Sequence, residues 1–216
     1  MKSYQIKTED YLDKLREVYV PAVNEPEPWR AVRWGSEELQ SSRLEVMEEL
    51  LLVSDLTEPY DWRFYSPYKS VLDVGCGRGE LIRYIRASQG DGYLGIDIVP
   101  EMIESARNTW PNMKFEVRDL RDEPRPAEAV VASGTFTISN DEIFWSMLDA
   151  MWESAGKIMA FNCKSTWAPE DCASAGGISY LRDPAETLTE CRKRYTRDLV
   201  LRHDYLDHDF TIAAYK

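Results

Sequence analysis

The chain is poor in basic side chains. Its 216 residues hold 26 Lys and Arg against 38 Asp and Glu, which gives a formal net charge of −12. A broad nucleic-acid surface needs clustered Lys and Arg to displace counterions, and an anionic membrane surface attracts the same residues. The charge balance therefore argues against nucleic-acid and membrane partners.

Long apolar runs, cysteine and histidine are also scarce. No stretch approaches 18 consecutive apolar residues, and the first ten residues lack the apolar core of a signal peptide. The 4 cysteines form no CxxC pair and none lies near either of the 2 histidines. This spacing indicates neither a zinc site nor a disulfide framework. We therefore expect a soluble, cytoplasmic protein with reduced thiols and no bound metal.

The chain itself is globular in composition, with 44% hydrophobic and 12% aromatic residues. Residues 1–60 show helical spacing, with helices expected over residues 8–20 and from Ser36 onward. Between these two helices lies an aromatic and basic stretch, 29–35, in an otherwise acidic protein. We expect residues 1–60 to form a helical cap or lid on a second domain, 61–216.

Residues 61–216 alternate short apolar runs with amphipathic segments. Strands are predicted at 71–74, 93–98, 114–117, 129–132, 157–161, 199–202 and 210–215. Helices are predicted over 80–87, from Pro100, over 141–154, and from Pro184, which follows an Asp183 N-cap. This alternation predicts an α/β fold with a mostly parallel sheet of seven strands, and the short connection before the last strand makes that strand antiparallel. Residues 165–182 show no periodicity and are expected to form a long loop.

One stretch carries the chemistry. Residues 71–81 read VLDVGCGRGEL, a buried strand followed by a glycine-rich turn and the start of a helix. Gly75 and Gly77 let the backbone approach a ligand where a Cβ would collide. The helix start beyond them offers unpaired amides. In open α/β sheets, ligands bind outside the carboxyl ends of the strands, which is where this turn lies.

The glycine order separates this turn from a dinucleotide site. A dehydrogenase fingerprint needs its third glycine one residue after Gly79, where Glu80 stands, and an acidic helix start is a poor cradle for a pyrophosphate. The same place suits a ligand that carries an amino acid and no phosphate. Asp73 can bind an ammonium group, directly or through water. Asp97, at the tip of the next strand, can accept both hydroxyls of a ribose while Ile98 lies against an adenine.

These residues resemble motif I and the strand tips of the class I S-adenosylmethionine-dependent methyltransferases, which have a Rossmann-like fold. The flanking sequences 34–43, 160–166 and 201–211 resemble a group of bacterial and phage members of that family. The resemblance implies S-adenosyl-L-methionine as the cofactor. The residues expected to bind it are Asp73, Gly75, Cys76, Gly77, Gly79, Asp97, Ile98, Met102, Arg118, Asp119, Leu120, Ser133 and Gly134.

A second set of residues is expected to cover the cofactor or bind the substrate. It comprises Trp34, Gln40, Arg43, Phe136, Lys164 and Ser165. The alternative for Trp34 and its helix is an ordinary packed indole with a solvated helix face. Both histidines lie near the loop between the last two strands, and the sequence leaves open which edge of the sheet that loop faces. His203 is the candidate general base, and a structural or exposed histidine is the alternative.

The expected activity is methyl transfer to a small-molecule acceptor by direct in-line displacement. The acceptor atom, whether oxygen, nitrogen or carbon, stays open. The Asn/Asp-Pro-Pro-Tyr/Phe motif of the enzymes that methylate nucleic-acid amino groups is absent; residues 133–136 read SGTF in its place. A protein methyltransferase and a non-catalytic S-adenosylmethionine-binding regulator are the alternatives. We expect a monomer or a homodimer.

Overall fold

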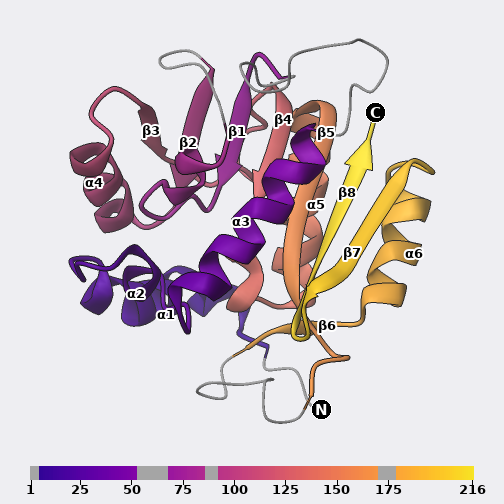
Figure 1. The fold of residues 1–216 in the computed structure, drawn as a ribbon, viewed down its shortest axis with the longest axis horizontal. Helices are drawn as coiled ribbons and strands as arrows, with labels where there is room; N and C mark the ends of the chain where they lie inside the picture. The colour runs from indigo at the N-terminus through magenta and orange to yellow at the C-terminus, as the bar shows by residue number, and fades with distance from the viewer. Residues whose placement is uncertain (1–4, 53–67, 86–91, 170–178) are drawn as a thin grey trace.

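The computed structural model describes residues 5–52, 68–85, 92–169 and 179–216. Its centre is one sheet with the strand order β3-β2-β1-β4-β5-β8-β7 (Figure 1). The strands are β1 (Val71–Val74), β2 (Tyr93–Asp97), β3 (Lys114–Val117), β4 (Ala127–Ala132), β5 (Ala155–Ser165), β7 (Leu199–Leu206) and β8 (Asp209–Tyr215). β8 runs antiparallel to both of its neighbours, while β1 to β5 are parallel. The expected sheet of seven strands with a reversed last strand is confirmed.

The helices cover both faces of this sheet. They are α1 (Tyr11–Tyr19), α2 (Pro28–Ala31), α3 (Glu37–Leu52), α4 (Pro100–Thr109), α5 (Asp141–Ser154) and α6 (Pro184–Arg194). In Figure 1, α3 crosses the front of the sheet, α5 lies behind it, and α1 and α2 lie below the strands. The predicted caps are present, because the Asp183 side chain accepts from the Glu186 amide and Ser36 Oγ accepts from the Leu39 amide.

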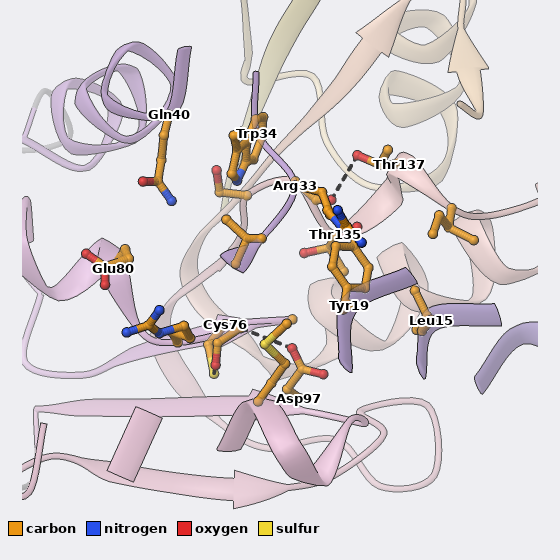
Figure 2. Close-up of a pocket in the computed structure, with 18 of the residues that line it drawn as sticks. Leu15, Tyr19, Arg33, Trp34, Gln40, Cys76, Glu80, Asp97, Thr135 and Thr137 are labelled. Atoms are coloured by element: carbon orange, nitrogen blue, oxygen red, sulfur yellow. Dashed lines mark hydrogen bonds between the residues drawn. The ribbon is translucent and has the colours of Figure 1, made fainter. Parts of the chain in front are cut away.

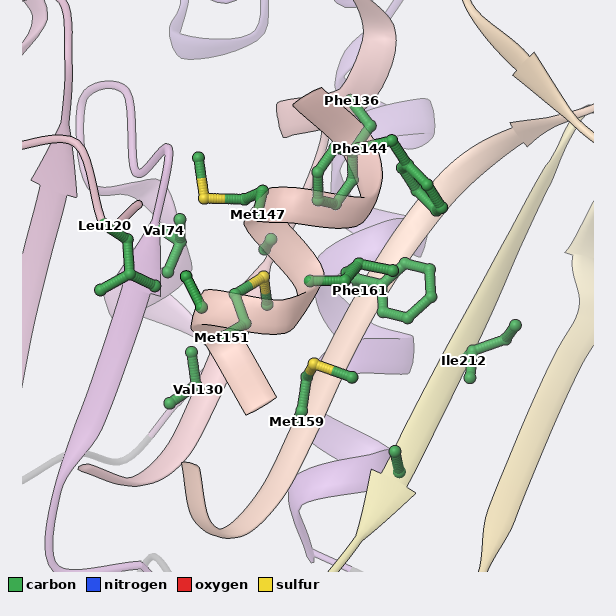
Figure 3. Packing of buried hydrophobic residues seen from close by; sticks show 14 of the residues in the cluster. Val74, Leu120, Val130, Phe136, Phe144, Met147, Met151, Met159, Phe161 and Ile212 are labelled. Atoms are coloured by element: carbon green, nitrogen blue, oxygen red, sulfur yellow. The ribbon is translucent and has the colours of Figure 1, made fainter. Parts of the chain in front are cut away.

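Strand periodicity distributes the apolar side chains between two cores. Leu72 and Val74 pack with α5 in one cluster, shown in Figure 3, whereas Val71 packs with α3 in the other. β4 is divided in the same way, with Val130 facing α5 and Val131 facing α3. Because both faces of the central strands are covered, these strands are continuous apolar runs in the sequence. Covered faces leave the strand ends as the places where a ligand can reach the sheet.

Two predicted segments differ from what the structure shows. The helix expected over 80–87 is a 3-10 helix, Glu80–Arg83, and residues 86–87 lie outside the described residues. The expected loop 165–182 ends in a short strand, β6 (Leu181–Arg182), which pairs with the end of β5. Only non-local pairing with Lys164 and Ser165 makes that segment a strand, so no local pattern marks it. Residues 170–178 of the expected loop lie outside the described residues.

The hairpin that joins β7 to β8 lies at the carboxyl end of β5. β8 is antiparallel to β5, so it begins where β5 ends, and Asp209 pairs with Lys164. The backbone amide of Ser165 donates to the carbonyl of His208 at 2.9 Å. The last hairpin therefore faces the same edge of the sheet as the glycine-rich turn.

Candidate active site

A cavity of about 780 Å³ lies at the carboxyl ends of the strands. This volume is within the range of about 300–1,000 Å³ that is usual for small-molecule sites. The strand ends supply one wall, and side chains of residues 11–44 supply the facing wall (Figure 2). Of the predicted site residues, those that line the cavity are Trp34, Gln40, Arg43, Asp73, Gly75, Cys76, Gly77, Asp97, Ile98, Met102, Arg118, Leu120, Ser133, Gly134 and Lys164.

The glycine-rich turn is tied to the tip of β2. Gly75 and Gly77 have φ angles of +68° and +54°, which side chains with a Cβ rarely adopt. The Gly77 amide donates to Asp97 Oδ2 at 3.0 Å, and the Val99 amide donates to Asp97 Oδ1 at 2.9 Å. Burial raises the pKa of Asp97 to about 6, although these amides favour its ionised form. Asp97 thus fixes the loop and also presents a carboxylate to the cavity.

Asp73 is a buried carboxylate at the end of β1. It is 3% exposed, lines the cavity, and accepts a hydrogen bond of 2.8 Å from the Tyr93 hydroxyl. Burial raises its pKa to about 7, and the Tyr93 hydrogen bond opposes that rise. Burial also raises the pKa of the neighbouring Cys76 thiol, which disfavours the nucleophilic thiolate. Asp73 is therefore available to a cation, while Cys76 contributes volume and backbone.

Glu80 also lines the cavity, although from the sequence it indicates only a poor site for a pyrophosphate. Its side chain is buried, and Oε2 accepts from Arg83 Nε at 2.6 Å. Oε1 is buried and has no hydrogen-bond partner among the described residues. A buried acceptor without a partner is costly, so it favours a ligand that donates there. Glu80 and Asp73 thus present two buried carboxylates to the same cavity.

The tip of β4 is held by a buried side chain from β5. Asn162, 3% exposed, accepts from the Gly134 amide at 2.7 Å through Oδ1 and donates to Ser133 Oγ at 2.9 Å through Nδ2. Gly134 adopts φ +76°. The sequence does not single out Asn162, because no local pattern shows that the pairing of β4 with β5 brings it next to Ser133. Asn162 therefore fixes the position of Ser133 and Gly134, both of which line the cavity.

The N-terminal segment contacts the glycine-rich turn after β1 and also Gly134 after β4. The Trp34 indole lies against Gly134, where no Cβ would fit, and Val32 Cγ1 lies 3.2 Å from the place of a Cβ on Gly77. Figure 2 shows Tyr19, Arg33 and Trp34 across the cavity from Cys76, which lies in the glycine-rich turn, and from Asp97 at the tip of β2. Arg33 itself is held by a 3.1 Å hydrogen bond from Nε to the Val18 carbonyl. The segment is thus a wall of the cavity.

Arg43 is engaged within the protein and is only 2% exposed. Its guanidinium pairs with Asp209, donates to the Leu39 carbonyl, donates to His208 Nε2 at 3.1 Å, and stacks on Trp34 at 3.8 Å from the ring centre. From the sequence, Arg43 is expected to cover the cofactor or bind the substrate, and it does line the cavity. Its donors bind the Leu39 carbonyl and the β7–β8 hairpin, and the plane of its guanidinium stacks on Trp34.

Five predicted site residues do not line the cavity. Gly79 packs against Phe115 and Trp110, and Phe136 belongs to the core behind the sheet. Asp119 lies in an adjacent surface depression, where both of its carboxylate oxygens accept from Arg121. Ser165 is fully buried, and its Oγ accepts from the Trp167 amide at 3.0 Å.

His203 is the fifth of these residues. Its ring lies 5.5 Å from the ring of Trp167 and 6.4 Å from that of Phe210, between centroids, on β7. His208, at the hairpin tip, lines the cavity instead. The carboxyl end of β5 lies next to the hairpin tip, so His208 and not His203 lines the cavity. The position of that end depends on strand pairing. The sequence alone could not choose between the two histidines.

The comparisons with known proteins agree with this geometry. Residues 71–155 match the family described as "Methyltransferase domain". The chain is 31% identical over 162 residues to "Putative methyltransferase Rv1506c" of Mycobacterium tuberculosis, across 68% of this chain and 93% of that protein. The fold resembles magnesium protoporphyrin IX methyltransferase (ChlM) from Synechocystis PCC 6803, crystallised with bound SAM, at a TM-score of 0.64 with 14% identity and full coverage of both chains. It also resembles the DhpI–SAH complex at a TM-score of 0.62, with 17% identity over 95% of this chain and 94% of that one.

The chain therefore belongs to the class I S-adenosylmethionine-dependent methyltransferases. Across the parts of the chain that the structure describes, no helix has the length and apolar character needed to cross a membrane. Within those same parts, no cluster of three His, Cys, Asp or Glu side chains is placed to hold a metal ion.

Proposed function

We propose that this enzyme binds S-adenosylmethionine along the glycine-rich turn and methylates a small molecule held at the tips of β4 and β5. One observation carries the proposal: a single walled cavity extends from the turn at Gly77, past Ser133, to Lys164 and His208. Such a cavity holds a cofactor and a second molecule side by side. The wall formed by residues 11–44 restricts the acceptor to a small one.

The cofactor half is assigned from the side chains that face it. The α-ammonium group fits beside Asp73 and the unpartnered Oε1 of Glu80, because buried acceptors there need a donor. The ribose hydroxyls face Asp97 at the tip of β2. The adenine fits among the apolar side chains of Ile98, Met102 and Leu120, all of which line the cavity.

Methyl transfer itself needs little acid–base catalysis from the protein. The sulfonium supplies an activated methyl group, and the chain's part is to hold the acceptor in line with it and to exclude water. Asn162 fixes Ser133 and Gly134, which lie between the two halves. His203 is left out of this mechanism because it lies outside the cavity. His208 lies within it, but its Nε2 already accepts from Arg43.

Two alternatives are distinguished by experiment. A protein methyltransferase would need an open groove, whereas residues from α1 to α3 wall this cavity. A regulator would bind the cofactor and never turn it over. Cytoplasmic location, a monomeric or homodimeric state, and the division into domains 1–60 and 61–216 stay predictions.

Turnover tests the proposal directly. The protein is incubated with S-adenosylmethionine and a metabolite library, and released S-adenosylhomocysteine is measured. We expect release with at least one small acceptor, and none in the Gly77→Val variant, whose side chain fills the cradle under Val32. Cofactor binding without release for any metabolite would favour the regulator. Release only with peptide or protein substrates would favour the protein methyltransferase.

A further inference from the structure

The cavity is also lined by a cluster of nitrogen donors that lies apart from the proposed cofactor half. We call this the donor cluster and define it as Arg43, Lys164 and His208, with their partners Asp209 and Ser179. Its members come from α3, from the carboxyl end of β5, from Ser179 and from the β7–β8 hairpin. In the strand order β1-β4-β5-β8, it lies beyond β4 from the glycine-rich turn. All of its members except Asp209 line the cavity.

Hydrogen bonding fixes where the protons of this cluster lie. A guanidinium can only donate, so the 3.1 Å contact between Arg43 and His208 Nε2 makes that nitrogen the acceptor. The neutral imidazole must then carry its proton on Nδ1. Lys164 Nζ donates to Ser179 Oγ at 3.0 Å, which uses one of its three hydrogens. Asp209 pairs with Arg43 and does not line the cavity, so the cluster offers donors to the cavity and no carboxylate acceptor.

The charges of the cluster do not cancel. Arg43 and Asp209 form a buried ion pair, and His208 is neutral because burial and the nearby Arg43 lower its pKa. Lys164 has no ion-pair partner among the residues that the structure describes, and Asp207 on the same hairpin is exposed to solvent. One positive charge is thus left against a partly buried wall. Such a charge is unfavourable unless an anion is brought to it.

We propose that the methyl acceptor carries a carboxylate group, which Lys164 and the Nδ1–H of His208 bind at the end of the cavity. This inference rests on the proposed methyl transfer. A carboxylate supplies the one negative charge that the cluster lacks and accepts from both donors. Burial also lowers the pKa of Lys164, and an anion beside it would reverse that effect. With its carboxylate at β5, the acceptor directs its other end toward Ser133 and the cofactor.

Matched pairs of acids and amides test this assignment. The probes are benzoate with benzamide, phenylacetate with phenylacetamide, 4-hydroxybenzoate with 4-hydroxybenzamide, and hexanoate with hexanamide. Each is titrated into the protein saturated with S-adenosylhomocysteine, and binding is measured by calorimetry and by the shift in Tm. At least one acid should bind about tenfold or more tightly than its amide, because a charge-assisted pair is stronger than a neutral hydrogen bond.

Variants locate the effect. Lys164→Met keeps an unbranched apolar chain as far as Cε and removes the charged nitrogen, so it should abolish the preference for the acid while the affinity for S-adenosylhomocysteine stays within about twofold. Lys157→Met on the same strand is the matched control, because Lys157 is exposed and pairs with Glu128 outside the cavity. That control should keep the preference. Ser179→Ala, which leaves the ammonium in place, should also keep it.

Three results would overturn the proposal. They are equal binding of acids and amides, no binding of any acid, and an acid preference that survives Lys164→Met in the folded protein. Calorimetry with S-adenosylhomocysteine alone is run first on every variant. If the wild type does not bind S-adenosylhomocysteine, the result counts against the proposed function. Its presence, combined with any of the three results, would count against the carboxylate site only.

Discussion

The indole of Trp34 lies against the Cα of Gly134, and no Cβ would fit between them. One of these residues precedes α3 and the other follows β4, so the contact joins the N-terminal segment to the sheet. The guanidinium of Arg43 stacks on the same indole, with its Cζ 3.8 Å from the centre of the Trp34 ring. The contact explains why residues far apart in the sequence form one cavity wall.

Gly134→Ala should therefore weaken cofactor binding as well as stability. A non-glycine residue at φ +76° costs about 1–2 kcal/mol, and the new methyl group pushes Trp34 out of place. A double-mutant cycle with Trp34→Ala separates these two effects. In the Trp34→Ala background, the Gly134 substitution should retain its cost in the free energy of unfolding but lose its effect on the Kd of S-adenosylhomocysteine. Additive effects on that Kd would contradict the contact.

Asp97→Ala should weaken S-adenosylhomocysteine binding by about 2 kcal/mol, because buried hydroxyls lose a charged acceptor. The same change frees the Gly77 amide, so the glycine-rich turn also loses a support. Asp119→Ala is the informative comparison, since both carboxylate oxygens of Asp119 bind Arg121 outside the cavity. Calorimetry should show a smaller loss for Asp119→Ala. Equal losses would return Asp119 to the cofactor-binding set that the family resemblance implies.

Asp73 predicts a pH dependence with opposite signs for stability and for binding. Its pKa is raised from 3.8 to about 7 by burial, so the folded protein holds the proton more tightly than the unfolded chain. The stability that this provides is present below the unfolded value and is lost as pH rises through the folded value. The Tm of the ligand-free wild type, relative to that of Asp73→Asn, should therefore fall between about pH 4 and pH 7.

Binding should change in the other direction. The ligand's ammonium group needs an ionised Asp73, so the affinity for S-adenosylhomocysteine should rise as pH increases over the same range. Asp73→Asn still accepts from Tyr93 but cannot ionise, and it should flatten that rise. An affinity profile unchanged by Asp73→Asn would remove Asp73 from the cofactor site.

Hydrogen exchange tests whether the N-terminal segment responds to the cofactor. Residues 11–44 supply one wall of the cavity, and lids of this kind tend to order when a ligand binds. We expect S-adenosylhomocysteine to add protection across residues 5–45 together with residues 75–80. Residues 199–202 of β7, whose side chains do not line the cavity, provide the internal control. Protection confined to the glycine-rich turn would leave the segment as a static wall.

The sequence predicted what local patterns determine. The bounds of β1, β3 and α5 follow from apolar periodicity, and the start of α6 follows from Asp183 and Pro184. The glycine-rich turn and Asp97 were also found, because a strand tip and its turn are contiguous in sequence. Strand pairing was not available from such patterns.

Non-local pairing accounts for most of what was missed. It creates β6, extends β5 to Ser165, and brings the hairpin tip to that end of the sheet. It therefore decides between His203 and His208. The positions of Asn162 and Glu80 depend in the same way on which strands and side chains meet. A buried polar residue within an apolar strand, as at Asn162, is the one sequence signal that could have indicated its role.

Calorimetry with S-adenosylhomocysteine and NAD is the most direct test of the central claim that the glycine-rich turn is a methyltransferase cofactor site. We predict saturable binding of S-adenosylhomocysteine at one site per chain, loss of that binding in Gly77→Val, and no heat from NAD. Binding of NAD with no response to S-adenosylhomocysteine would contradict the account.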